Sequence, residues 1–476
     1  MPKFKPSSLL IKEFPHHPTP GQQELFNLFD EFLAVTDAEK PTLMLRGYAG
    51  TGKTSIMSTI VNTLPRFRLR AVLLAPTGRA AKVMTTYSGI PALTIHKKIY
   101  RRTADPGSGA LQFSRQPNFH RKTLFIVDEA SMIADDPGPG RSGLLADLIS
   151  YVFEHESNRL MIIGDTAQLP PVGQHLSKAL DADFLRYTFR MSLLETELTE
   201  VTRQSLESGI LFNATELRKH MQEEEFRPKF RIAKYTDTYK MRGNRLEDGL
   251  RYAYDKYGID DTVVICRSNK AAVHFNRYVR HQILYNENEL DASDRLMIVK
   301  NNYFVLSEDD PASFLANGDL VEVRRIVSTE EAYGFRFADL ELQLIDFPDQ
   351  PPFIARTHLE TLHGNTTSLP EDRYEELLEK VQEEYQDIKN KRERTKAVRD
   401  DEYINALQVK FAYALTCHKS QGGQWDAVFV DYGYMTDERI NEEYFRWLYT
   451  AITRAKSELF FMNFPNEFFE PANEAD

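Results

Sequence analysis

Short apolar runs alternate with helical patterns along most of the chain. Four runs read as buried parallel strands, because nearly every position is apolar and each run ends in small or polar residues: 42–47, 71–77, 123–130 and 159–165. A second series with the same pattern follows at 262–268, 410–416, 427–433 and 458–464. The pattern predicts an α/β protein with two parallel-sheet cores, in which ligands bind beyond the carboxyl ends of the strands.

A long insert separates the runs of the second series. Its first half alternates apolar and polar positions over 295–307, 317–326 and 335–347, and Asn317-Gly318 is a turn signal. This predicts a small antiparallel barrel or sheet. Its second half carries an apolar helical stripe from Tyr374 to Ile388, followed by the highly charged stretch 389–402. We interpret it as a solvated arm or helical hairpin; a coiled-coil partner site is the alternative.

A shorter insert lies within the first series. The sequence DPGSG, residues 105–109, is a strong turn signal between two possible strands and predicts a projecting β-hairpin. The expected division is therefore a first core from 1–82 and 121–190, a hairpin domain over 83–120, a second core from 191–290 and 406–476, and an accessory domain over 291–405.

Composition narrows the class of protein. The 476 residues are 42% apolar, no stretch of 18 apolar residues occurs, and the N-terminus lacks the apolar core of a secretory signal. Both cysteines, Cys266 and Cys417, lie in strand-like runs, so they are expected as core residues of a cytoplasmic protein with no membrane partner.

The net charge of −11 argues against a nucleic-acid partner when taken alone. Much of the acid is concentrated in residues 369–387, however, whereas 95–102 and 118–122 are basic. A local groove lined by cations and backbone donors is compatible with this distribution.

The segment GYAGTGKT, residues 47–54, is a complete phosphate-binding loop between a buried strand and an apolar helix. The loop glycines let backbone N–H groups face phosphate oxygens, and the helix adds its positive N-terminal end. Lys53 is expected to reach the β- and γ-phosphates, and Thr54 to offer its hydroxyl to Mg²⁺. The expected nucleotide contacts in this segment are Gly47, Gly50, Thr51, Gly52, Lys53, Thr54 and Ser55.

Acidic and amide side chains follow two other strands of the first series. Asp128 and Glu129 end the run at 123–130, where a phosphate-loop enzyme needs one carboxylate for Mg²⁺ and can use a second to deprotonate the attacking water. Asp128 suits the first role and Glu129 the second. Gln168 follows the fourth strand and is placed to sense the γ-phosphate through water. These residues predict ATP and Mg²⁺ as cofactors.

Eight motifs in a fixed order carry a family resemblance. GYAGTGKT, APTGRAAK, TIHK, DEASM, GDTAQLPPVG, LTEVTRQ, YALTCHKSQGGQWD and YTAITRAK resemble the ordered motifs of superfamily 1 DNA helicases, most closely the RecD/Dda-like branch, and span Gln22 to Lys456. The resemblance implies two RecA-like motor domains, with a hairpin in the first and an SH3-like β domain plus helical segment in the second.

The resemblance also implies roles for single residues at the nucleotide. Gln22 matches the adenine-reading glutamine, with Gln23 as the alternative. Arg203 and Arg454 match two arginines that act on the γ-phosphate from the second core, a role that suits the guanidinium fork. Gly422 matches a hinge that senses nucleotide, but Gly423-Gln424 replaces the family's acidic residue, which leaves a ribose contact in doubt.

Other matched positions are implied to hold single-stranded DNA: Thr77, His96, Thr416, His418 and Lys419. The hairpin would act as a pin that separates the strands of a forked duplex, with Phe113 and Phe119 available to stack on an end base pair.

The resulting prediction is a monomeric, ATP-dependent DNA helicase that moves 5′ to 3′. Three alternatives remain: an RNA-directed helicase, a translocase that needs a partner complex, and a non-motor ATPase switch or DNA-binding subunit.

Overall fold

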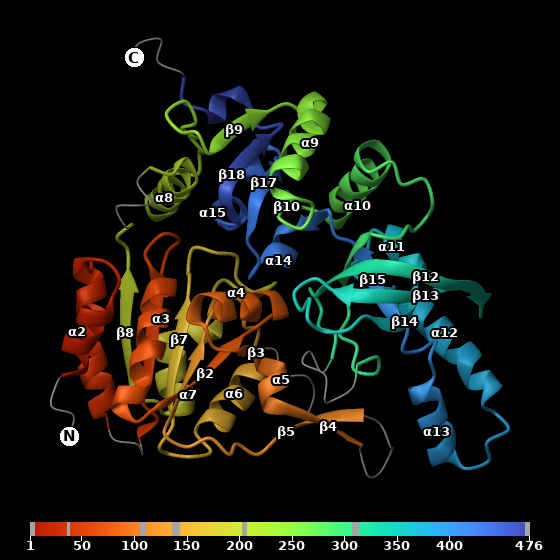
Figure 1. Ribbon diagram of the computed structural model, residues 1–476, viewed down its shortest axis with the longest axis horizontal. Coiled ribbons are helices and arrows are strands. Elements are labelled where there is room, and N and C mark those ends of the chain that lie inside the picture. Colours follow the sequence, from red (N-terminus) through yellow and green to blue (C-terminus); the bar gives the residue numbers. More distant parts are fainter. Residues whose placement is uncertain are drawn as a thin grey trace.

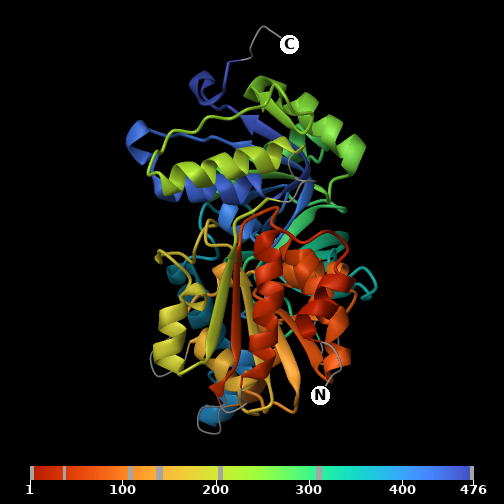
Figure 2. The same cartoon turned by 90° about the vertical axis from the view of Figure 1, so that its left-hand side faces the viewer.

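The structure is a computed structural model that describes residues 5–35, 39–104, 111–135, 143–201, 207–306 and 314–471. Two sheet-based cores lie one above the other, and a barrel with a helical arm lies beside them (Figure 1, Figure 2). Within these ranges no helix combines the length and apolar character needed to cross a membrane.

The first core is built on a six-stranded parallel sheet. Its strand order is β3 (Ala92–Thr94), β2 (Arg70–Ala75), β6 (Thr123–Val127), β7 (Arg159–Gly164), β1 (Thr42–Gly47) and β8 (Leu193–Leu198). The central strands β1, β6 and β7 are largely apolar and buried because both of their faces are covered. Leu43 and Leu45 pack with α1 (Pro6–Glu13), α2 (Pro20–Ala34) and α3 (Lys53–Thr63), whereas Met44 packs with α5 (Ile95–Ile99), α6 (Leu144–Val152) and α7 (Ala182–Phe189).

The second core is built on a five-stranded parallel sheet. Its order is β16 (Ala414–Thr416), β10 (Thr262–Cys266), β17 (Trp425–Asp431), β18 (Ala455–Met462) and β9 (Thr238–Met241). Cys266 and Cys417 are buried, as expected for core residues. The helices of this part are α8 (Gly209–Gln222), α9 (Leu246–Tyr257), α10 (Asn269–Tyr278), α14 (Cys417–Ser420) and α15 (Glu442–Ile452).

The long insert forms a closed barrel and a helical arm. The barrel strands are β11 (Arg295–Ile298), β12 (Leu320–Ala332), β13 (Phe335–Leu344), β14 (Phe353–His358) and β15 (Leu407–Phe411). All neighbours are antiparallel except β14 and β15, which close the barrel in parallel. After the short α11 (Glu360–His363), α12 (Glu371–Glu384) and α13 (Lys391–Asp400) make the predicted helical hairpin; Leu377 and Val381 of its stripe pack against Phe335 and Phe337.

Several elements fall outside the expected divisions. The edge strand β8 lies beyond the expected boundary at 190, β3 lies inside the segment expected as a hairpin domain, and β15 lies beyond 405. The run 410–416, expected as one strand of the second core, is divided: β15 belongs to the barrel and β16 to the second sheet. A continuous apolar run does not reveal this change of sheet, because both halves are buried.

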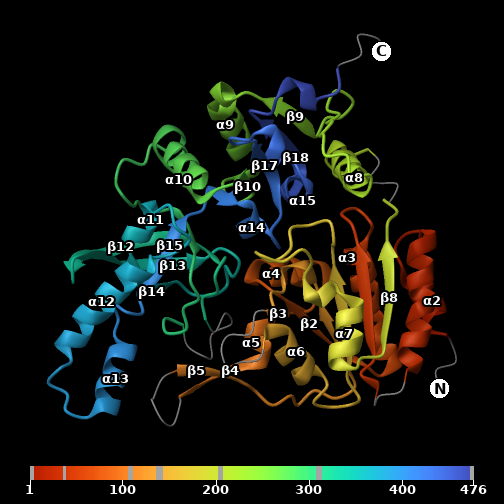
Figure 3. The same ribbon diagram turned by 180° about the vertical axis from the view of Figure 1, so that it is seen from behind.

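The hairpin consists of β4 (Tyr100–Ala104) and β5 (Leu111–Arg115), which pair from Tyr100 with Arg115 to Ala104 with Leu111. It projects from the lower side of the first core in both broad views (Figure 1, Figure 3). The expected turn at 105–109 lies outside the described residues.

Candidate nucleotide and nucleic-acid sites

The phosphate loop connects β1 to α3, as its sequence predicts. Gly50 and Gly52 have φ of 75° and 84°, a conformation that side chains rarely adopt, and Gly52 caps the N-terminus of α3. The Lys53 ammonium donates to the carbonyl oxygens of Gly47 at 2.6 Å and Tyr48 at 2.9 Å. The lysine is therefore held over its own loop, where its charge is available to an anion. Thr54 and Ser55 follow in the first turn of α3.

Gln22 is tied to the same loop. It is buried, its amide oxygen accepts from the N–H of Thr19, and its amide nitrogen donates to the carbonyl oxygen of Thr51 at 2.9 Å. In this structure Gln22 thus connects the start of α2 to the phosphate loop. Its contact with adenine, implied by the resemblance, stays a prediction.

Asp128 and Glu129 follow β6. In the sheet β6 is adjacent to β7, and β1 is the next strand beyond β7. Desolvation raises the pKa of Asp128, the charge of Glu129 raises it further, and the attraction of Lys53 offsets only part of this. Carboxylate and hydroxyl oxygens are the donors that Mg²⁺ prefers, so Asp128 and Thr54 fit the expected metal role.

Glu129 has a left-handed backbone, with φ of 53°, although it is not a glycine. Such strain is concentrated at functional sites because surrounding structure must maintain it. The conformation turns the chain sharply after Asp128, whose Oδ1 accepts from the Glu129 N–H at 2.8 Å.

Gln168 lies on the loop after β7, between the ends of β1 and β6. Its side chain is buried, and its Oε1 atom has no hydrogen-bond partner among the described residues. An unpartnered buried acceptor is costly unless it has a function. This position is compatible with orienting a water molecule.

Arg454 follows α15 in the second core and is 3% exposed. Its guanidinium donates only to neutral acceptors in the described structure: the carbonyl oxygens of Thr450 at 3.0 Å and Gly423 at 3.3 Å, and the Thr453 hydroxyl at 3.4 Å. A buried guanidinium without a carboxylate suits an anionic ligand. Arg203, the second implied arginine, lies outside the described residues.

Gly422 approaches the first core rather than the phosphate loop. It has φ of 74°, and a Cβ atom there would lie 2.9 Å from both the Thr77 hydroxyl and Ala80 Cβ. Thr77 itself caps α4 (Gly78–Ser88), because its hydroxyl accepts from the Ala80 N–H. Gly422 therefore marks a close contact between the cores, and its implied role at the nucleotide stays a prediction.

Residues implied to hold DNA converge on one pocket of about 290 Å³, where the first core, barrel and second core meet. Burial lowers the pKa of His96, so its ring acts as a neutral partner at pH 7. Lys419 donates to the Asn317 side chain of the barrel. Of the implied contacts, the pocket walls contain Thr77, His96, His418 and Lys419. Thr416 instead lines an adjacent cavity that shares Lys419.

The two aromatic residues expected at the pin lie at different places in the structure. Phe119 is 87% exposed but follows β5 by four residues, past the base of the hairpin. Asn118 anchors this segment, because its amide donates to the carbonyl oxygen of Tyr151 at the end of α6 at 2.7 Å. Phe119 therefore lies beside the base of the hairpin, and its stacking on an end base pair stays a prediction. Phe113 pairs with Arg102 within the hairpin, and its side chain lies outside the described part of the structure.

Two contacts between the first and second cores were not predicted from the sequence. Arg79 of α4 stacks on Trp425 with its guanidinium carbon 3.9 Å from the ring centroid. Tyr449 of α15 contacts the phosphate loop through a hydrogen bond to Ala49. Arg79 lies in the motif APTGRAAK, Trp425 in YALTCHKSQGGQWD and Tyr449 in YTAITRAK, so membership of a motif was the available signal for all three.

Comparisons with known proteins agree with this arrangement. An AAA domain family model matches residues 30–231, and a UvrD-like helicase C-terminal domain model matches residues 411–462. The first match contains the phosphate loop and the acidic pair, and the second contains Thr416, Gly422 and Arg454.

Two relatives in sequence and one solved structure are similar to this chain over different lengths. The ATP-dependent RecD2 DNA helicase of Deinococcus radiodurans is 29% identical over 39% of this chain, and that match spans 23% of RecD2. The ATP-dependent DNA helicase dda of Enterobacteria phage T4 is 25% identical over 67% of this chain and 69% of its own. The Bacteroides Pif1 helicase crystal structure with ADP-AlF3 and ssDNA has a TM-score of 0.47 and 17% identity, covering 96% of this chain and 95% of Pif1. With its motifs in order across both cores, the chain belongs to the superfamily 1 helicases of the RecD and Dda type.

Proposed function

We propose that this chain is an ATP-dependent DNA helicase that moves along single-stranded DNA from 5′ to 3′ and separates duplexes. The observation that carries the proposal is the convergence of the motif residues on two neighbouring sites at the junction of the cores. One site holds Lys53 and Asp128, and the other is the pocket with His96 and Lys419. RecD2 and Dda, which are similar in sequence to parts of this chain, are named ATP-dependent DNA helicases.

The residues of the first site suit hydrolysis of ATP. Lys53 would neutralise charge on the phosphates, Glu129 would take the proton of the attacking water, and Gln168 would orient that water. Arg454 would stabilise the charge that develops on the transferred group. Mg²⁺, held by Thr54 and Asp128, would supply further charge neutralisation.

The second site suits a sequence-tolerant grip on a single strand. Hydroxyls, a neutral imidazole and a lysine contact phosphate and sugar without reading bases. Because its walls come from both cores and the barrel, a change in the distance between the cores changes the pocket. Alternating grip on the strand then gives translocation.

The finer parts of the proposal rest on the motifs. The proposal includes binding of forked DNA and action as a monomer. It also includes the division into two motor domains, a hairpin domain and an accessory domain. The cytoplasmic location is supported by the two free, buried cysteines.

Unwinding of forked substrates tests the function. A duplex with a 5′ single-stranded tail should be unwound with ATP, a duplex with only a 3′ tail should not, and DNA should be a better substrate than RNA of the same sequence. Unwinding that requires a 3′ tail would contradict the polarity. Preference for RNA would favour the RNA-directed alternative, and ATP hydrolysis without any translocation would favour a switch.

A further inference from the structure

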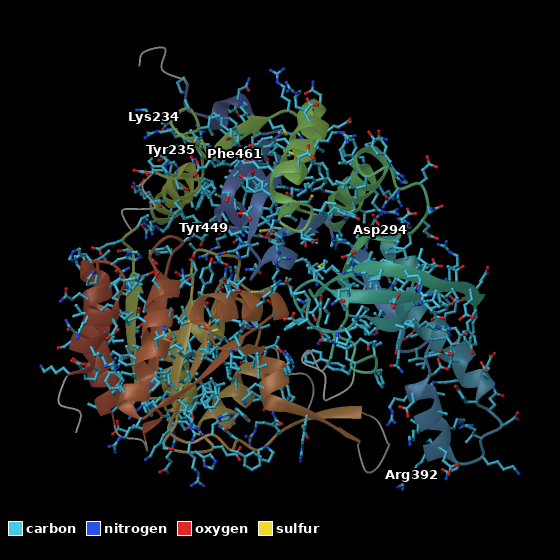
Figure 4. The ribbon with its side chains drawn as sticks, in the orientation of Figure 1. Lys234, Tyr235, Asp294, Arg392, Tyr449 and Phe461 are labelled. Atoms are coloured by element: carbon cyan, nitrogen blue, oxygen red, sulfur yellow. The ribbon has the colours of Figure 1, made fainter. Side chains whose placement is uncertain are left out.

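The hydroxyl of Tyr449 joins the second core to two loops of the first. Tyr449 is 1% exposed and lies on α15 at the junction between the cores (Figure 4). Its oxygen accepts from the backbone N–H of Ala49 in the phosphate loop at 2.8 Å. It donates to Oδ2 of Asp165, on the loop after β7, at 2.7 Å. One hydroxyl thus contacts two residues that lie 400 and 284 positions away from it in the chain.

The surroundings of Asp165 and Ala49 show how each interacts with the Tyr449 hydroxyl. Asp165 is 1% exposed; its Oδ1 accepts from the Ala167 N–H at 3.0 Å, which leaves Oδ2 to Tyr449. Burial beside Asp165 raises the pKa of Tyr449 well above its ordinary value, so the hydroxyl keeps its proton and stays a donor. The Ala49 N–H belongs to a loop whose amides serve as phosphate donors.

Helix α15 also contacts the loop after β7 through two further hydrogen bonds. The Thr450 hydroxyl accepts from the Leu169 N–H at 2.8 Å, and the Arg446 guanidinium donates to the carbonyl oxygen of Thr166. The helix then leads into Arg454, whose Nε donates back to the carbonyl oxygen of Thr450 at 3.0 Å. The place of α15 on the first core therefore sets the place of Arg454.

We propose that Tyr449 is a positioning residue for Arg454, and that its hydroxyl transmits the arrangement of the phosphate loop to α15. A phosphate group on the loop competes with the hydroxyl for the Ala49 N–H, so filling the loop changes the contact that fixes the helix. This inference rests on the proposed ATPase function, and it adds a residue that acts through Arg454 rather than on the phosphate.

Tyr449→Phe tests the inference, because it keeps the ring and removes only the hydroxyl. Tyr444→Phe is the matched control: Tyr444 lies on the same helix, is equally buried, and its hydroxyl has no hydrogen-bond partner within the described residues. The readouts are kcat and KM for ATP with saturating single-stranded DNA, together with the melting temperature of each variant.

Tyr449→Phe should lower kcat about 10- to 100-fold, the scale for losing a hydrogen bond to a buried charge, with KM within about twofold of the parent. Tyr444→Phe should match the parent in kcat and KM. A kcat within about twofold of the parent for Tyr449→Phe would overturn the inference, as would equal losses in the two variants. A parent without DNA-stimulated ATPase activity would instead refute the proposed function.

A double-mutant cycle separates positioning from general weakening of the interface. Single-turnover hydrolysis with enzyme in excess resolves slow rates, so Tyr449→Phe can be measured in an Arg454→Ala background. If Tyr449 acts through Arg454, the second substitution should cost less than about threefold there. The same fold loss in both backgrounds would show that the hydroxyl acts independently of the arginine.

Discussion

Asp128 and Glu129 are neighbours in sequence but have different surroundings. The pKa of Asp128 is raised by desolvation and by Glu129, whereas the strained backbone of Glu129 directs the chain away from β6. Adjacent carboxylates with different environments can serve different roles, one on a metal ion and one on a proton.

Substitution of each acid by its amide should separate the two roles. Glu129→Gln should bind nucleotide with Mg²⁺ normally and lower turnover by 10² or more, the scale for loss of a general base. Asp128→Asn should weaken nucleotide affinity and its dependence on Mg²⁺ together. Titrations of a fluorescent nucleotide at several Mg²⁺ concentrations would measure this. Identical binding curves for the two variants would contradict the division of roles.

Asp319 should make the free energy of unfolding of the protein fall as pH rises. It is buried between the barrel and α4, and desolvation raises its pKa to about 7. Between about pH 4 and 7 the folded state keeps a proton that the unfolded state has lost, so folding is favoured at the acidic end of this window. Asp319→Asn should remove that dependence and raise the melting temperature at pH 8 more than at pH 5. An equal shift at both pH values would argue against it.

At the scale of elements, the loop at Gly422 packs tightly against α4. Its backbone conformation and the short distances to Thr77 and Ala80 leave no room for a side chain. Gly422→Ala should therefore push α4 and the second core apart and reduce DNA-stimulated ATPase activity about tenfold or more.

Gly89→Ala provides the control for this substitution. Gly89 has nearly the same φ, 72°, but a Cβ atom there would meet no atom within 4 Å. The Gly89→Ala variant therefore has the backbone strain of Gly422→Ala but no steric clash of the added Cβ atom. Equal losses of DNA stimulation in the two variants would show that strain alone, and not contact between the cores, is responsible.

The β4–β5 hairpin has a separable role in the proposed helicase. Replacing residues 104–111 by a tight turn should leave DNA-stimulated ATPase activity and single-strand translocation intact, because the phosphate loop and the DNA pocket lie elsewhere. Unwinding of a 5′-tailed duplex should fall sharply. A shortened variant that unwinds as well as the parent would mean that the hairpin is not a separating pin.

At the scale of the whole molecule, the net charge of the chain and the charge of the DNA pocket differ in sign. The chain carries −11, yet the pocket that gathers His96 and Lys419 is lined by neutral and basic side chains together with backbone groups. Salt largely screens charges that lie farther than about 8–10 Å from the bound strand, so the side chains that line the pocket, and not the net charge of the chain, decide binding.

Binding of single-stranded DNA should therefore be sensitive to salt and tolerant of sequence. The logarithm of the affinity should fall with the logarithm of salt concentration with a slope of about −0.7 for each neutralised phosphate. Fluorescence anisotropy with mixed and homopolymeric oligonucleotides measures both properties. A flat salt response would be incompatible with an electrostatic groove.

The sequence by itself determined the local features. The phosphate loop, the acidic pair and the central strands could be predicted because each depends on contiguous residues: loop glycines, a strand followed by acids, and apolar runs covered on both faces. The first helix of the insert, α12, could be predicted for the same reason, from a stripe with helical spacing, whereas the charged stretch that forms α13 left a solvated arm and a helical hairpin open.

Only the tertiary structure decided the features that join distant segments. The edge strands β3, β8 and β9 were not predicted, because an edge strand is buried less completely and its pattern is weaker. The place of Phe119 was also decided by tertiary contacts, because Asn118 anchors this segment beside α6, past the base of the hairpin. The partners of Tyr449 could not be inferred, since a hydroxyl in a motif does not reveal which loops of the other core it meets; packing of α15 on the first core brings the three together.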